Sequence, residues 1–298
     1  MNTRKIGKLR GLEKNQQRLG WMFIIPALLL IALTCFYPMI ETLLLSFQSG
    51  KANNLSFSGF RNYARLIKDK TFLAALENSV YYLFLQIPIM LAISLFLAVL
   101  VNDKGVRGRG VYRTLIFLPA ATSLASCSII FMRIFANDGY LNTLLLQTNV
   151  IEEYIAFLSD KWMARAIIML VITWRWAGVN MIYFLTGLQN IDDSLYEAAS
   201  IDGATGMQQF GYITVPLLKP TILMTTILST TGNIKLFDEV YNITGGGPAN
   251  ATITLSNYLY RLCFDGVPQY GYASAVASVI FIIAAVLALI QMKVGDKE

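Results

Sequence analysis

The sequence predicts an all-α integral membrane protein with six transmembrane helices. Hydrophobic residues make up 55% of the 298 residues and charged residues only 14%, so the chain is far more apolar than an ordinary globular domain. Polar segments separate six apolar stretches, each close to the ~20 residues that a bilayer requires. A soluble core cannot bury so much apolar surface, and the chain is therefore expected to lie in a membrane.

The first elements are a basic cytoplasmic tail over residues 1–20 and the first transmembrane helix over residues 21–48. The tail carries six Lys and Arg residues and one acidic residue, Glu13. A basic start before an apolar run is also typical of a signal peptide, but this run is too long and lacks a small-residue cleavage site. We expect a retained anchor, followed by an outside loop over residues 49–71.

The other five spans are expected at the following positions: 78–101, 111–136, 163–188, 216–237 and 271–292. Because the total is even, both termini lie on one side of the membrane. The excess of Lys and Arg in the 1–20 tail and in the 104–113 segment favours the cytoplasm as that side, although the 49–71 loop is also basic. The basic 104–113 run is expected to contact anionic membrane lipid. A short cytoplasmic tail, 293–298, ends the chain.

The polar loop at 189–219 falls on the cytoplasmic side and predicts two short helices joined by a glycine. Ser194 and Glu197 have the spacing of a capping box, and so do Thr205 and Gln208. Gly203 lies where a helix would end in the left-handed conformation, which only glycine adopts at low cost.

One face of the first short helix is apolar and small, since Ile191, Leu195 and Ala198 recur at helical spacing. Such a face outside the bilayer needs a partner to cover it. Pro216 suits the first turn of the span that follows.

This loop also resembles the coupling loop of membrane subunits of binding-protein-dependent ABC importers. The resemblance rests on Glu197-Ala198-Ala199, Gly203 and Ile213-Thr214-Val215-Pro216, with Val215 in place of the usual leucine. Arg113-Thr114-Leu115-Ile116-Phe117-Leu118-Pro119 and Thr244-Gly245-Gly246-Gly247-Pro248 are similar to the carbohydrate-importing branch, in particular to its maltose-type first permease subunit. The resemblance covers nearly the whole chain and implies a type I ABC importer permease fold with its core at 72–292.

The resemblance implies that the loop docks on a separate ATPase. The residues expected to couple the two proteins are Glu197, Ala198, Ala199, Gly203, Met207, Phe210, Ile213 and Pro216. The chain has no Gly-x-x-x-x-Gly-Lys-Ser/Thr phosphate loop, so ATP and Mg would be bound by that ATPase and no cofactor by this chain. The other implied partners are a second homologous permease subunit and an extracytoplasmic solute-binding protein.

Polar residues inside the fourth and fifth spans are the candidates for a solute path. Arg175 lies near mid-membrane, ~20 Å along the helix from Trp162, where an ionisable side chain is by default a functional hypothesis. Pairing with a backbone carbonyl and lining a water-filled cavity are the alternatives. The other candidates are Asn180, Tyr183, Ser229 and Asn233 for sugar hydroxyls and Trp176 for stacking on a sugar ring, although polar residues also join helices. Asp238 and Glu239 are expected to be solvated charges at the outer end of the fifth span.

Composition argues against several other functions. The chain has no histidine, and its cysteines (Cys35, Cys127 and Cys263) are scattered, which favours neither a metal site nor a disulfide framework. Its basic residues are not interleaved with aromatic ones, so nucleic-acid binding is disfavoured. A membrane-embedded enzyme would need clustered acids or a nucleophile with a base inside the spans, and a secondary transporter gives no reason for the cytoplasmic motif.

The sequence therefore predicts a permease subunit that moves a sugar or oligosaccharide across the cytoplasmic membrane. An importer of the same fold for phosphate, a polyamine or a peptide remains open, because Arg175 fits an anionic group.

Overall fold

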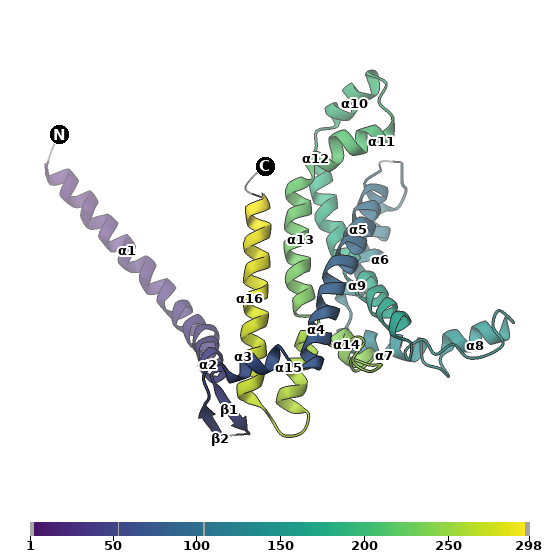
Figure 1. Cartoon of the computed structure of the whole chain (residues 1–298). Coiled ribbons are helices and arrows are strands. Elements are labelled where there is room, and N and C mark those ends of the chain that lie inside the picture. Colours follow the sequence, from purple (N-terminus) through teal and green to yellow (C-terminus); the bar gives the residue numbers. More distant parts are fainter. Residues whose placement is uncertain (1–2, 53, 104, 296–298) are drawn as a thin grey trace.

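The structure is a computed structural model that describes residues 3–52, 54–103 and 105–295, and it consists mainly of long helices that run between two ends of the molecule (Figure 1). Within the described residues, four helical segments are long and apolar enough to span a membrane: Gln17–Ser46, Lys70–Asn102, Lys161–Gln189 and Tyr270–Gly295. Two bent helix pairs raise the number to six if each pair is one span. Residues 1–2 and 296–298 of the expected tails lie outside the described residues.

Three helical segments widen into a π-helical turn two residues before a proline. These turns are η1 (Ala32–Phe36) before Pro38, η2 (Tyr82–Gln86) before Pro88, and η3 (Phe210–Thr214) before Pro216. Proline has no N–H to donate to the carbonyl four residues earlier. The backbone hydrogen bonds near it therefore change locally from the α-helical to the π-helical spacing. Pro216 thus opens the three-residue helix α12 (Val215–Leu217) instead of the span itself.

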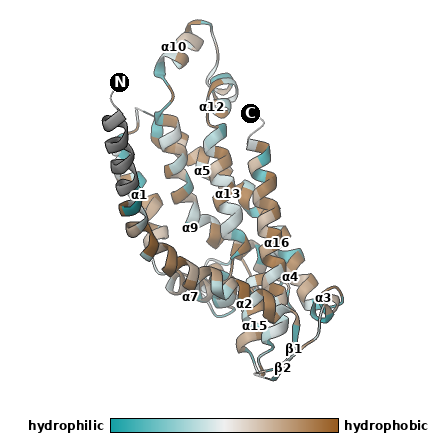
Figure 2. Cartoon of the chain, turned by 90° about the vertical axis from the view of Figure 1, so that its left-hand side faces the viewer, coloured by the Kyte–Doolittle hydropathy of each residue, from teal (hydrophilic) through white to brown (hydrophobic). Residues whose placement is uncertain are grey.

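The first span leaves the helical body along most of its length (Figures 1 and 2). It consists of the part of α1 (Thr3–Ile31) that begins at Gln17, followed by η1 and α2 (Tyr37–Ser46), and its most apolar window buries no residue inside the chain. Only its last turns pack against the start of α16 (Tyr270–Gly295), where a Cβ on Gly271 would overlap the Gln48 carbonyl. The apolar side chains of this span therefore face the surroundings of the chain.

The expected outside loop at 49–71 contains a small β-sheet, so the prediction of an all-α chain is wrong in this detail. Strands β1 (Gln48–Lys51) and β2 (Asn54–Phe57) pair antiparallel, with Gln48 opposite Phe57. The helix α3 (Arg61–Leu66) follows, and the Asn62 amide donates to the carbonyls of Ser46 and Gln48 at 2.9 and 2.6 Å. This buried amide ties the hairpin to the end of the first span.

The second and fourth spans begin earlier than their apolar stretches, because an aspartate caps each of them. Asp69 accepts from the Thr71 and Phe72 amides at the start of α4 (Lys70–Tyr81), which continues through η2 into α5 (Ile87–Asn102). Asp160 caps α9 (Lys161–Gln189) in the same way. The second span therefore starts at Lys70 instead of residue 78.

The third and fifth spans are bent, which hydropathy alone did not predict. Helices α6 (Arg109–Ala121) and α7 (Leu124–Ile134) meet at 93° within the stretch expected to form the 111–136 span. The α11–α12 segment, Gly206–Leu217, meets α13 (Lys219–Ile234) at 66°, and α13 covers most of the expected 216–237 span. A Cβ on Gly178 of α9 would overlap the Ile116 carbonyl, so this glycine lets α6 lie directly on α9.

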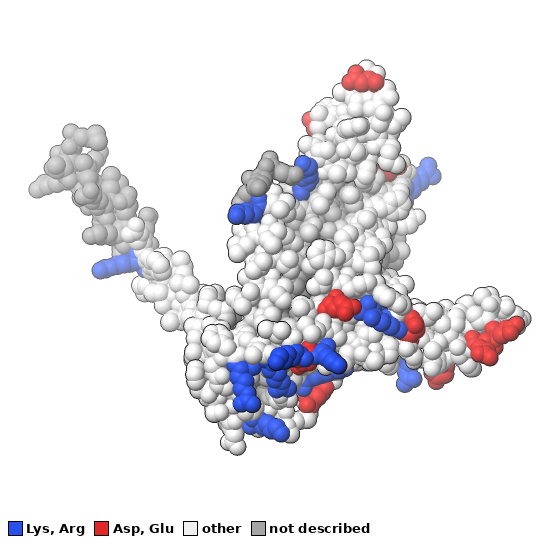
Figure 3. All heavy atoms as spheres, in the orientation of Figure 1, with Lys and Arg blue, Asp and Glu red and all other residues white. Residues whose placement is uncertain are grey.

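The remaining helices lie at the two ends. Helices α8 (Tyr140–Gln147), α14 (Asp238–Ile243) and α15 (Leu255–Phe264) lie at the hairpin end, and α10 (Asp193–Ile201) and α11 (Gly206–Gln209) at the opposite end (Figure 1). Charged side chains gather at these ends and on the α8 arm, while the middle of the visible face is mainly uncharged (Figure 3). This charge distribution suits a chain embedded across a bilayer.

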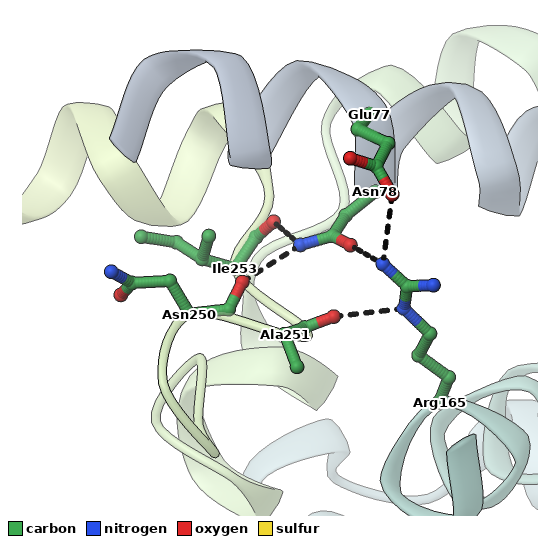
Figure 4. Close-up of polar contacts among 6 residues, drawn as sticks. All are labelled: Glu77, Asn78, Arg165, Asn250, Ala251 and Ile253. Carbon is green, nitrogen blue, oxygen red and sulfur yellow. Dashed lines mark hydrogen bonds and ion pairs between the residues drawn. The ribbon is translucent and has the colours of Figure 1, made fainter. Parts of the chain in front are cut away.

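A buried arginine fastens the loop between α14 and α15 to the body (Figure 4). Arg165 of α9 is 3% exposed; its Nε donates to the Ala251 carbonyl at 2.9 Å, and its Nη2 donates to Asn78 Oδ1. The Asn78 amide donates in turn to the Asn250 and Ile253 carbonyls at 3.0 and 2.9 Å. This arginine clamp therefore joins α4, α9 and the loop at one point.

Candidate functional site

The loop at 189–219 folds as two short helices around a left-handed glycine. Gly203 has a φ of +80°, and Thr205 and Gln208 form the predicted capping box. The predicted Ser194–Glu197 box is wrong, because Asp192 is the N-cap of α10 and accepts from the Ser194 amide at 2.9 Å. An aspartate one position before the helix offers an acceptor to its first amides, so the serine two positions later is already helical.

Side-chain hydrogen bonds hold this loop together. The Tyr196 and Thr214 hydroxyls are 2.9 Å apart, and the Gln209 amide donates to the Ser200 hydroxyl at 2.9 Å. The loop is thus tied to η3, which leads into the fifth span.

The outer surface of the loop carries exposed apolar side chains. Helix α10 buries no residue; Leu195 and Ile201 are exposed, and Met207 is 79% exposed. Among the other predicted coupling residues, Glu197, Ala198 and Pro216 are exposed, whereas Ala199, Phe210 and Ile213 are half-buried. Large apolar side chains exposed together at one end are typical of a protein interface.

A cavity of about 350 Å³ lies among the helices η2, α9, α13 and α14. Five of the six predicted solute-path residues line it: Trp176, Asn180, Tyr183, Ser229 and Asn233. Its volume is near the lower end of the range for small-molecule sites, and its wall is mostly apolar with a few polar groups, as such sites are.

The cavity combines aromatic faces with amide groups. Trp176 and Tyr183 expose 42% and 37% of their surface. The Asn180 amide donates to the Trp176 carbonyl at 3.0 Å, and the Asn233 amide to Gln86 Oε1 at 3.5 Å, so their carbonyl oxygens remain as acceptors. Such a wall can stack on an apolar ring face while it exchanges hydrogen bonds with hydroxyl groups.

Arg175 does not line the cavity. Its guanidinium is buried at the bend of the third span, where it donates to the carbonyls of Pro119 and Thr122 at 3.3 and 2.9 Å. These carbonyls lie at the end of α6, and that of Pro119 also accepts from the Thr122 amide at 3.3 Å. The sequence left three roles for Arg175: contact with solute, pairing with a backbone carbonyl and lining a water-filled cavity. In the structure, Arg175 pairs with backbone carbonyls.

Two polar residues of the cavity were missed by sequence reasoning. Gln86 lies in η2, and a polar residue inside an apolar span just before a proline was a usable signal. Glu239 was expected in solvent, but it is 4% exposed and lines the cavity. No sequence signal separated Glu239 from its exposed neighbour Asp238, since only the packing of α14 against α7 and α9 buries it.

Metal ligation has no support in the described part of the chain, where no group of three His, Cys, Asp or Glu side chains converges. The three cysteines differ in burial: Cys35 is exposed, Cys127 is buried and Cys263 is half-buried.

Similar proteins identify the family. The family model described as the binding-protein-dependent transport system inner membrane component matches residues 73–296. The lactose transport system permease of Rhizobium radiobacter is 47% identical over 274 residues, which cover 91% of this chain and 92% of that protein. The arabinooligosaccharides transport system permease of Bacillus subtilis (strain 168) is 34% identical over 294 residues, covering 96% and 91%.

A solved structure shows the same fold. A chain from the crystal structure of a bacterial ABC transporter that imports the acidic polysaccharide alginate aligns with a TM-score of 0.84 at 23% identity, over 96% of this chain and 98% of that one. With the matched region, the relatives and the fold in agreement, the chain belongs to the family of binding-protein-dependent transport system inner membrane components.

Proposed function

We propose that this chain is one permease subunit of an ATP-driven importer that carries a sugar or oligosaccharide across the cytoplasmic membrane. The observation that carries the proposal is the cavity, which gathers Trp176, Tyr183, Asn180 and Asn233 between the helices of a permease fold. Relatives named for lactose and arabinooligosaccharide transport support the solute class.

The exposed loop is proposed to be the docking site for an ATPase subunit. Leu195, Ile201 and Met207 would be covered by a groove of the ATPase, and Ala198 would allow close approach of α10. When ATP and Mg close the ATPase dimer, the motion of α10 would pass through η3 to the fifth span. The cavity would then change its side of access, and hydrolysis would reset it.

Two further partners complete the proposed assembly. A second homologous permease would close the other side of the solute path, and membrane lipid would cover the remaining apolar surface. A solved alginate transporter contains a periplasmic protein with a bound pentasaccharide. By analogy, an extracytoplasmic solute-binding protein would deliver solute at the end that carries α14, α15 and the β-hairpin, with both termini in the cytoplasm.

The coupling assignment is tested by purifying the tagged chain in mild detergent and identifying what stays bound by mass spectrometry. Glu197→Lys reverses a charge at the centre of the exposed loop and is expected to lose the ATPase while it keeps the second permease. Glu152→Lys makes the same change at an exposed position on the opposite end and serves as the matched control. Retention of the ATPase by Glu197→Lys at wild-type levels would refute the assignment.

The solute class is tested separately by uptake. Cells with the complete importer are expected to accumulate a neutral sugar, and Asn180→Ala and Asn233→Ala to slow that uptake at normal expression. Uptake of phosphate, a polyamine or a peptide instead of any sugar would reject the solute class and leave the permease assignment in place.

A further inference from the structure

The cavity contains a buried carboxylate that no role in the proposed transport cycle yet explains. Glu239 lies in the first turn of α14, is 4% exposed and is one of the residues that line the cavity. The other charged residues of that wall, Lys235 and Asp238, are exposed. A carboxylate is costly to bury, and such groups are retained mainly where they have partners or a function.

The pKa of Glu239 depends on its burial and on the charged and hydrogen-bonding groups around it. Burial raises the pKa of Glu239, and the negative charge of Asp238 adds to the rise, whereas a hydrogen bond from its own backbone N–H, the charge of Arg175 and a hydrogen bond from Trp176 oppose it. The Arg175 guanidinium is bound to the carbonyls at the bend of α6 and α7, outside the cavity wall. Glu239 is therefore a buried acidic residue of the cavity wall, whereas Arg175, whose positive charge opposes the rise of its pKa, is not part of that wall.

A carboxylate in this position suits a hydroxyl-rich ligand without charge. When ionised it only accepts hydrogen bonds, and every sugar hydroxyl can donate one. Charge-assisted hydrogen bonds of this kind are about twice as strong as neutral ones. A second carboxylate on the ligand would meet a like charge at short range in a poorly solvated cavity, where repulsion is weakly screened.

We propose that Glu239 makes the cavity selective for uncharged sugars over sugar acids. The carboxylate accepts hydrogen bonds from sugar hydroxyls beside the Trp176 ring and repels a uronate. This inference rests on the proposed function, since it narrows the solute class of the same cavity.

The test measures binding to the complete purified importer without a solute-binding protein, because such a protein would impose its own selectivity. The probes are a neutral disaccharide that the wild-type importer takes up and the same sugar with its terminal hydroxymethyl group oxidised to the uronate. For the wild type, we expect the neutral sugar to bind more tightly. For Glu239→Gln, which keeps the shape and removes the charge, we expect the ratio of the two Kd values to fall roughly tenfold, or about 1.4 kcal/mol.

Two further variants separate charge from packing. Glu239→Asp keeps the charge and is expected to keep the preference for the neutral sugar, with weaker binding overall. Glu152→Gln makes the same substitution at an exposed position far from the cavity and is expected to match the wild type. An equal loss of preference in Glu239→Gln and Glu239→Asp would overturn the inference, as would an unchanged ratio in Glu239→Gln. Tighter wild-type binding of the uronate would overturn the inference alone, and wild-type uptake of no sugar at all would overturn the proposed function with it.

Discussion

Asp69 connects the start of α4 with α15 and α16 through hydrogen bonds. One carboxylate oxygen accepts from the Thr71 and Phe72 amides and so caps α4, and the other accepts from the hydroxyls of Tyr258 and Tyr272 at 2.5 and 2.7 Å. Burial by itself would raise the pKa of Asp69, but these four hydrogen bonds outweigh it and hold the pKa below the ordinary value of 3.8. The ionised form is thus favoured by the fold.

This shift predicts a pH dependence of stability. Because the pKa of Asp69 is lower in the folded chain than in the unfolded one, its contribution is present above about pH 4 and is lost as the pH falls through the folded value. The melting temperature of Asp69→Asn in detergent is expected to lie below that of the wild type at pH 7, and the difference should shrink at low pH. The exposed Asp138→Asn is the control. A difference that stays constant between pH 7 and pH 3 would contradict this role.

Features of single residues could be predicted from the sequence where neighbouring residues determine them, and not where distant elements do. The left-handed Gly203 and the Thr205–Gln208 box were predictable because their neighbours in sequence decide them. The cap at Asp192 was equally local and was missed because the serine pattern was preferred. The burial of Glu239 was not predictable, since α7 and α9, far away in sequence, create it.

At the scale of elements, the arginine clamp joins α4, α9 and the 244–253 loop. Only one of its contacts is an ion pair, to Glu77 at 3.5 Å, and Glu77 is 69% exposed. The buried Arg165 also donates hydrogen bonds to the Ala251 carbonyl and to Asn78, and its guanidinium lies over the Tyr81 and Trp162 rings, 4.8 and 5.2 Å from their centroids. An exposed ion pair contributes little, whereas a buried acceptor that loses a charged donor costs more.

The clamp therefore predicts unequal effects of removing its members. Arg165→Met is expected to destabilise the chain by about 3 kcal/mol, because the Asn78 and Ala251 oxygens lose their donor. Glu77→Gln is expected to cost less than ~1 kcal/mol. Thermal unfolding of the purified chain and proteolysis of the 244–253 loop measure both. Equal losses in the two variants would show that the surface ion pair, and not the buried hydrogen bonds, fastens the loop.

The positions of the helices could be predicted from the sequence, but their bends could not. Hydropathy located the four helices that are long and apolar enough to span a membrane and the two bent pairs, and aspartates at 69 and 160 explain why two spans start early. The 93° bend of the third span was not predictable from hydropathy, and Arg175 of α9 donates to the carbonyls of Pro119 and Thr122 at the break. A hydropathy profile records composition along the chain and carries no information on such a contact.

For the whole molecule, the central question is how the two polar ends lie relative to the membrane. Figure 1 shows the start of α1 and the end of α16 directed toward the end that carries α10 and α11, while the β-hairpin and α15 lie at the other end. Between these ends the first span exposes apolar side chains along its length (Figure 2), which only lipid or another apolar chain can cover. The proposed function requires α10 to lie in the cytoplasm, because ATP is there.

This arrangement predicts opposite labelling of two engineered cysteines. In a background in which Cys35, Cys127 and Cys263 are replaced by serine, Ser56→Cys in β2 is expected to react with a membrane-impermeant maleimide in right-side-out vesicles. Ser194→Cys in α10 should react only after the vesicles are opened, since both positions are exposed and differ only in their side of the membrane. Native Cys35, exposed in the first span, should resist the same reagent in both preparations because a membrane-impermeant reagent does not reach a thiol that lipid covers. Labelling of Ser194→Cys in closed vesicles would invert the orientation and remove the coupling role of α10, whereas rapid labelling of Cys35 would show that the first span is outside the bilayer.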